Sequence, residues 1–332
     1  MFTPRGLLKR AVMRVMCLSQ LDRLLLGSRR GLTIVLSLHR VSPVPNPYFA
    51  PLHPRDFEGL LQFLSRHAIV RGLRDEPSKR RDKPQVILSF DDGYLDFVEY
   101  AMPLLAKYEM RANQNVIPAN VERGTPSWDV ALKDRLCSAP RSLLEQIQLP
   151  VFPRRPVEPG DEGKARFSSA LSRALKLVAP PEREAQIEEV NHMLRDVPYV
   201  ATRIMSVRDI REAAKYHEVG GHSWSHESMS NQTDTFFRED LRKCFDWFDR
   251  ELELPMDIYA FPSGSYREHQ IEILRDANVK HILLVDHQML KGESDVYPRL
   301  PITAFDADEA RLRAAGLFAM GTRRGETRST RA

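Results

Sequence analysis

Apolar segments rich in β-branched residues alternate with amphipathic segments along much of this chain, and this alternation most restricts how it can fold. The segment VILSF (86–90) is continuously apolar apart from one serine, as buried parallel strands are, and LTIVLSLHR (32–40) has similar composition. Residues 53–67 instead place their large apolar side chains on one helical face. Further strands are expected at 111–118, 218–222, 258–264, 280–286 and 297–303. The pattern predicts an α/β fold with parallel strands.

The alternation stops between about residues 120 and 205, where we find helical patterns and no convincing strand. We interpret 120–205 as a helical insertion in an α/β body that spans 31–320. The basic segment 321–332 is expected to be a disordered tail.

Composition limits the class of protein. The chain is 42% hydrophobic and 28% charged, as soluble globular proteins are, and no apolar run approaches a membrane span. Three widely spaced cysteines match neither a disulfide framework nor a zinc finger and favour a reducing, cytoplasmic location. The net charge of +4 comes from the two ends: 1–30 has seven basic residues against one acidic, and 311–332 has six against one. The body is therefore acidic, and no nucleic-acid partner is expected.

Residues 1–30 form the pattern of a basic amphipathic helix. Charges interrupt what would be the apolar core of a secretion signal, and no small-residue cleavage site follows. The apolar stripe consists of Leu8, Val12, Val15, Leu18, Leu21 and Leu25. Two interpretations remain open: the stripe packs against the domain, or it makes weak contact with an anionic membrane at its inner face.

Two adjacent carboxylates, Asp91 and Asp92, follow directly on the apolar strand 86–90. Neighbouring negative charges at a buried strand end are costly unless a positive group compensates them. Asp-Gly is also ordinary turn chemistry, so the segment predicts either a turn or a metal or acid–base site.

A second polar motif, GGHSWSH, places His222 and His226 after another short strand. Since the carboxyl ends of parallel strands share one face, the histidines and the aspartates are expected there together. One carboxylate and two imidazoles are suitable ligands for a catalytic divalent metal. In a third motif, YAFPSGSY, the turn at Ser263 could aim a backbone N–H at an oxyanion or be an ordinary turn.

The motifs SFDDG, HSWSH and FPSG, in this order, resemble the polysaccharide deacetylase (NodB-homology) family of carbohydrate esterases, and LSLHRVSP resembles its opening motif. The resemblance covers most of 31–305 except the insertion. It implies a distorted (β/α) barrel of about seven strands and removal of acetyl groups from N-acetylated sugars of a glycan. It makes Asp91 the catalytic base and the N–H of Ser263 an oxyanion donor. The implied ligands of a divalent metal, with zinc expected, are Asp92, His222 and His226.

Two features depart from the family pattern. Many members have an arginine in the third motif where this chain has Ala260, and LVDH, which ends at His287, comes too early for the usual general acid. The acid is therefore unassigned. His39 and Arg299, near predicted strand ends, are candidate substrate contacts or structural residues. Trp128 of the insertion, which we expect to shape substrate choice, is either a sugar-stacking platform or a buried anchor.

Three other functions remain open at this point. The same site could hydrolyse O-acetyl esters of a carbohydrate. The missing arginine also fits a catalytically degenerate carbohydrate-binding protein, although the complete ligand set argues against it. The basic ends could make the chain an adaptor at a membrane surface or on nucleic acid.

Overall fold

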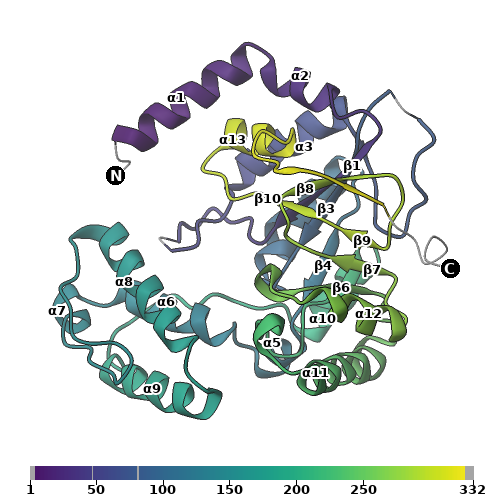
Figure 1. Cartoon of the computed structure of the whole chain (residues 1–332). Helices are drawn as coiled ribbons and strands as arrows, with labels where there is room; N and C mark the ends of the chain where they lie inside the picture. The colour runs from purple at the N-terminus through teal and green to yellow at the C-terminus, as the bar shows by residue number, and fades with distance from the viewer. Residues whose placement is uncertain (1–3, 47, 81, 326–332) are drawn as a thin grey trace. The chain divides into compact units, whose positions relative to one another are not determined.

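The computed structural model describes residues 4–46, 48–80 and 82–325. The chain divides into two compact units. The larger, which we call the barrel unit, comprises Met1–Val44, Pro51–Gly124 and Met205–Ala332. The smaller, which we call the helical unit, comprises Pro45–Ala50 and Thr125–Ile204. Figure 1 shows a curled sheet in the barrel unit and a separate group of helices in the other.

The sheet of the barrel unit is built from parallel strands in chain order. These are β1 (Leu32–Leu38), β3 (Gln85–Phe90), β4 (Asn113–Val116), β5 (Glu218–Gly221), β6 (Ile258–Ala260) and β7 (His281–Leu283). Two short consecutive strands then join its edges: β9 (Val296–Tyr297) pairs with β7, and β10 (Arg299–Pro301) pairs with β1. The sheet therefore curls back on itself, and the predicted distorted (β/α) barrel is confirmed.

Three strands were not expected from the sequence. β2 (Ile69–Val70) extends beside β3, β8 (Gln288–Lys291) runs antiparallel to β1, and β11 (Gly321–Arg324) pairs with β8. The segment predicted as a disordered tail, 321–332, thus begins with a strand, because the free edge of β8 offers backbone groups that β11 satisfies. The rest of that prediction, over 326–332, lies outside the described residues.

Helices cover the sheet of the barrel unit (Figure 1). They are α1 (Pro4–Leu18), α2 (Leu21–Gly27), α3 (Pro54–His67), α4 (Met102–Lys107), α5 (Pro118–Arg123), α10 (Val207–Ala214), α11 (Asp234–Trp247), α12 (Glu268–Asp276) and α13 (Ala307–Ala314). Short π-helical segments, η1 (Phe97–Ala101) and η3 (Phe248–Leu252), and 3-10 turns, η2 (Met229–Asn231) and η4 (Pro262–Gly264), complete the unit. The single helix expected within 1–30 is two helices, because Gln20 takes a left-handed conformation with φ of 62°.

The helical unit has a core of its own. Its helices are α6 (Trp128–Ser138), α7 (Arg141–Leu144), α8 (Gly160–Leu175) and α9 (Pro180–Met193). Leu132 and Leu136 of α6 pack with Leu171 and Leu175 of α8, at the four-residue spacing that places side chains on one helical face. The structure thus has independent helical packing where the sequence predicted an insertion.

Candidate active site

The two neighbouring aspartates end strand β3 in different environments. Asp91 continues the sheet, because its N–H donates to the carbonyl of Leu38 in β1 at 3.0 Å. Asp92 leaves the strand conformation with φ of 76°, and Gly93 follows with φ of 69°. A non-glycine residue in this left-handed region is uncommon and marks a sharp change of direction. The turn therefore separates two carboxylates that are adjacent in sequence.

Asp91 is buried and paired with an arginine from the far end of the chain. Arg299 of β10 contacts both carboxylate oxygens of Asp91 at 2.9 Å, and neither side chain is more than 3% exposed. The guanidinium also donates to the carbonyl of Leu284 and to the hydroxyl of Ser89. Asn115 of β4 donates its amide N–H to Asp91 Oδ1 at 2.8 Å. The carboxylate is thus fixed by side chains of two other strands, β4 and β10.

The electrostatics of this pair keep Asp91 ionised. Burial alone raises the pKa of a carboxyl group, but the charge and hydrogen bonds of Arg299 outweigh burial and hold the pKa of Asp91 well below its usual range. The imidazole of His222, and that of His39, which directly follows β1, add to this lowering of the Asp91 pKa. The compensating charge demanded by adjacent aspartates therefore comes from Arg299 in the case of Asp91.

Asp92 faces the two histidines. The Nε2 atoms of His222 and His226 each lie 3.5 Å from Asp92 Oδ1, and ligand atoms of the three residues lie within 4.8 Å of one another. Within the described residues, Asp92 Oδ1 is buried and has no hydrogen-bond partner. A buried carboxylate oxygen facing two imidazole nitrogens fits a divalent cation.

The ring of His222 is oriented by the neighbouring strand β6. His222 shares a hydrogen bond between Nδ1 and the carbonyl of Ala260 at 2.9 Å, so its Nε2 points toward Asp92. Burial lowers the pKa of His222 to about 4, which leaves the imidazole neutral at pH 7 and able to act as a ligand. Ala260, the departure from the family motif, thus contributes its backbone carbonyl.

The loop that carries both histidines is held by an acid of helix α11. Asp240 accepts hydrogen bonds from the Ser223 hydroxyl at 3.0 Å and from the Trp224 N–H at 2.9 Å. Ser223 in turn accepts from the N–H of His226 at 3.1 Å. Ser223 and His226 have φ of 64° and 61°, so these hydrogen bonds maintain a rarely adopted backbone.

The remaining predicted site residues have varied surroundings. Ser263 lies in η4 with φ of 55°, its side chain exposed, and within the described residues its N–H donates to no backbone carbonyl. Arg299, considered as a substrate contact, has no exposed surface and faces Asp91. Trp128 starts α6 in the helical unit, where the Arg183 guanidinium lies 4.9 Å from its ring centroid and the indole packs on the core.

Sequence reasoning missed two supporting residues, Asn115 and Asp240. Asn115 belongs to three consecutive amide side chains, NQN (113–115), which are fully buried in strand β4. Such a polar run in an apolar strand is a signal that could have been read, since buried polar groups require partners. Gly220 on β5 makes room for it, because a Cβ there would lie 2.6 Å from Asn115 Oδ1. Asp240 has no comparable signal, because a helical acid is usually on the surface.

A comparison with protein-family models finds a match to part of this chain. The family model described as polysaccharide deacetylase matches residues 184–282, which include both histidines and Ser263. The resemblance to the polysaccharide deacetylase family is confirmed. A comparison with curated sequences gave no match.

Solved structures share the polysaccharide deacetylase fold. The Streptococcus pyogenes deacetylase PplD, in complex with acetate, is 15% identical, with a TM-score of 0.55 over 86% of this chain and 99% of that one. IcaB from Ammonifex degensii is 15% identical, with a TM-score of 0.54 over 86% and 97%. A de-N-acetylase from Aggregatibacter actinomycetemcomitans is 12% identical, with a TM-score of 0.51 over 84% and 99%. At these identities the likeness establishes the fold.

Proposed function

We propose that this chain is a metal-dependent hydrolase that removes acetyl groups from N-acetylated sugars of a polysaccharide or glycan intermediate. The observation that carries the proposal is the convergence of Asp92, His222 and His226 beside the ionised Asp91. The family match supports a polysaccharide deacetylase, and the substrate class and the metal are our inference.

Asp92, His222 and His226 would hold the cation, which we propose to be zinc, and such a cation supplies Lewis-acid polarisation of a carbonyl oxygen when bound. A His₂Asp donor set suits this metal and other first-row ions. The buried, unpartnered Oδ1 of Asp92 and the backbone-oriented ring of His222 support this assignment.

Asp91 would act as the general base. Its carboxylate takes a proton from the water molecule whose oxygen bonds to the acetyl carbonyl carbon. Arg299 and Asn115 hold the carboxylate in place during this step, so we assign them positioning roles. The N–H of Ser263, which donates to no backbone carbonyl among the described residues, would donate to the oxyanion. The C–N bond then breaks, acetate leaves, and the amine nitrogen takes up one proton. This uptake balances the proton that Asp91 gained from water.

Two substitutions at the aspartates test the proposal. Asp91→Asn keeps the shape and removes the proton acceptor, so acetate release from N-acetylated glycans should fall about 10²- to 10⁴-fold with metal content unchanged. Asp92→Ala removes a ligand and should lose both metal and activity. The matched control is Asp234→Ala, because Asp234 lies 2.9 Å from His269 on the surface and outside the cluster.

The outcomes also separate the alternatives. Equal metal loss in both variants would mean that the two carboxylates share the ion and that the base lies elsewhere. Full activity in both would reduce the SFDDG motif to a turn. Acetate release from O-acetylated but not N-acetylated glycans would make the chain an ester hydrolase. Glycan binding by metal-loaded protein with no acetate release from either would indicate a degenerate binding protein.

A contact between Trp128 and the sugar is a further proposal. Trp128 would stack on a sugar ring, and glycan affinity should fall in a folded Trp128→Ala variant; unchanged affinity would exclude it.

The described residues contain no helix that is long and apolar enough to cross a membrane. We propose a cytoplasmic location and a role in exopolysaccharide metabolism, for which fractionation of cells provides the test.

A further inference from the structure

Helix α1 turns its apolar side away from the protein. Leu8, Val12, Val15 and Leu18 are 66%, 50%, 64% and 69% exposed. Their three- and four-residue spacing places them on one face. An amphipathic helix of a globular domain normally buries this face. We refer to these four residues as the apolar arc.

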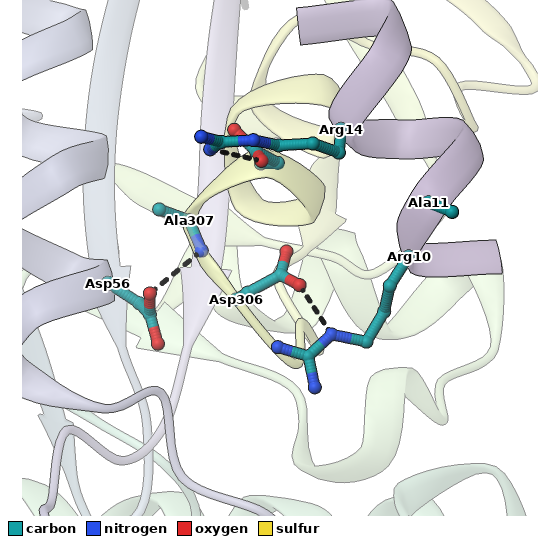
Figure 2. A pocket seen from close by; sticks show the side chains of 7 residues that line it. Arg10, Ala11, Arg14, Asp56, Asp306 and Ala307 are labelled. Carbon is teal, nitrogen blue, oxygen red and sulfur yellow. Dashed lines mark hydrogen bonds and ion pairs between the residues drawn. The ribbon is translucent and has the colours of Figure 1, made fainter. Parts of the chain in front are cut away.

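The opposite, charged side of α1 attaches the helix to α13. Three ion pairs join α1 to α13 and its N-cap residue Asp306: Lys9–Glu309 at 2.8 Å, Arg10–Asp306 at 2.9 Å and Arg14–Asp308 at 3.1 Å. Figure 2 shows Arg10 and Arg14 reaching toward α13 around a cavity of about 380 Å³, which Ala11 also lines. Met13 and Cys17 also pack against Leu312. The contact with α13 therefore fixes which side of α1 faces outward.

Exposed cations follow the apolar arc along the chain. Asp22, the acid among residues 1–30, is buried and pairs with Arg311 of the body. Arg23 and Arg30 of the following segment are exposed, and Leu24 between them is 68% exposed. Apolar side chains flanked by cations are complementary to an anionic bilayer surface. A second copy of this chain would present the same cations and is less suited to cover it.

We propose that α1 and α2 dock this protein on an anionic lipid bilayer, with the apolar arc at the boundary between headgroups and acyl chains. The carboxylates of α13 hold the cationic side of α1 against the protein, so that the arc is presented without refolding. In Figure 1 both helices lie outside α13 and α3. The proposal goes beyond the deacetylase function and does not depend on it.

Vesicle co-sedimentation of the full chain tests this proposal. The chain should bind to vesicles of about one-third phosphatidylglycerol in phosphatidylcholine. It should bind much less to vesicles of phosphatidylcholine alone. Val12→Glu/Val15→Glu should weaken binding about tenfold or more, because it places charges in the apolar arc. The matched control is Leu177→Glu/Val200→Glu in the helical unit, where the two side chains are 89% and 81% exposed. This control should bind as the unmodified chain does.

Further measurements check the fold of the variant, the role of the cations and the alternative occupant of the arc. Circular dichroism must show that the Val12→Glu/Val15→Glu protein is folded. Arg23→Gln and Arg30→Gln should each weaken binding to anionic vesicles about fivefold, and unchanged binding in both would reject the role of these cations. Binding unaffected by the arc substitutions would reject the apolar arc as the docking surface. A dimer in solution that Val12→Glu/Val15→Glu converts to a monomer, without vesicle binding, would assign the arc to a second copy. Acetate release from a soluble substrate reports separately on the catalytic site.

Discussion

The strand-end site and the contact between α1 and α13 both pair arginine with aspartate, but in opposite surroundings. Arg299 and Asp91 are 0% and 3% exposed, and their pairing is supported by further hydrogen bonds. Arg14 in the other contact is 66% exposed, against 13% for Asp308. Water can solvate Arg14 when its pair breaks, whereas it cannot reach Arg299. The same two residue types therefore form a pair that the buried site needs for stability and, at α1, a solvent-exposed pair that contributes little.

The difference shows what each region requires. The strand-end site must keep a buried carboxylate ionised at one position, which demands a full counter-charge and several donors. The α1 contact has only to choose which face of a helix points outward, and several weak pairs suffice. Substitutions that remove one member of each pair should expose this contrast.

The largest effect is expected at the buried pair. Arg299→Met should lower the free energy of unfolding by about 3–5 kcal/mol, because Asp91 is left buried without its counter-charge. Urea unfolding at pH 7, in chelator to remove any metal, measures this change. Asp91→Asn in the same chain should restore much of the loss, since no unpaired charge then remains. A cost of Arg299→Met under about 1 kcal/mol would show that the pair is dispensable.

An intermediate effect is expected at Asp240, which is buried among neutral donors instead of a cation. Burial raises its pKa to about 6 despite hydrogen bonds from Trp224 and Ser223. Because an unfolded aspartate titrates near 4, the folded state binds the extra proton between about pH 4 and 6. The free energy of unfolding should therefore fall through this window as pH rises, by an amount on the order of 2–3 kcal/mol from this group.

Asp240→Asn removes that titration. The difference in unfolding free energy between the variant and the unmodified chain should shift in favour of the variant as pH rises from 4 to 7. Chemical unfolding at both pH values provides the measurement, with Asp234→Asn as an exposed control. Parallel pH profiles for the Asp240→Asn variant and the unmodified chain would contradict the burial argument.

The smallest effect is expected at the exposed pair. Arg14→Gln should change the free energy of unfolding by no more than about 1 kcal/mol, because solvent screens this contact. The change should shrink further when salt is raised. A loss similar to that of Arg299→Met would mean that the α1 contact is as obligatory as the buried pair, and the contrast would disappear.

Much of the site could be predicted because the chemistry is local to strand ends. Asp91 and Asp92 follow one strand and His222 follows another, and parallel strands bring such ends to one face. The order of the motifs along the chain also predicted the family and its fold. The support of these residues could not be predicted in the same way. Arg299 is 208 residues from Asp91, and its strand is only three residues long.

The amino-acid sequence by itself determined the alternating strands and helices, the carboxylate and imidazole pairs, and the existence of an apolar stripe on the first helix. Only the tertiary structure decided that Arg299 neutralises Asp91, and that the first part of the stripe faces outward. Periodicity fixes which residues share a helical face but not which face meets the protein. That choice depended on the acids of α13, almost 300 residues away along the chain, whose charges bind the opposite side of α1.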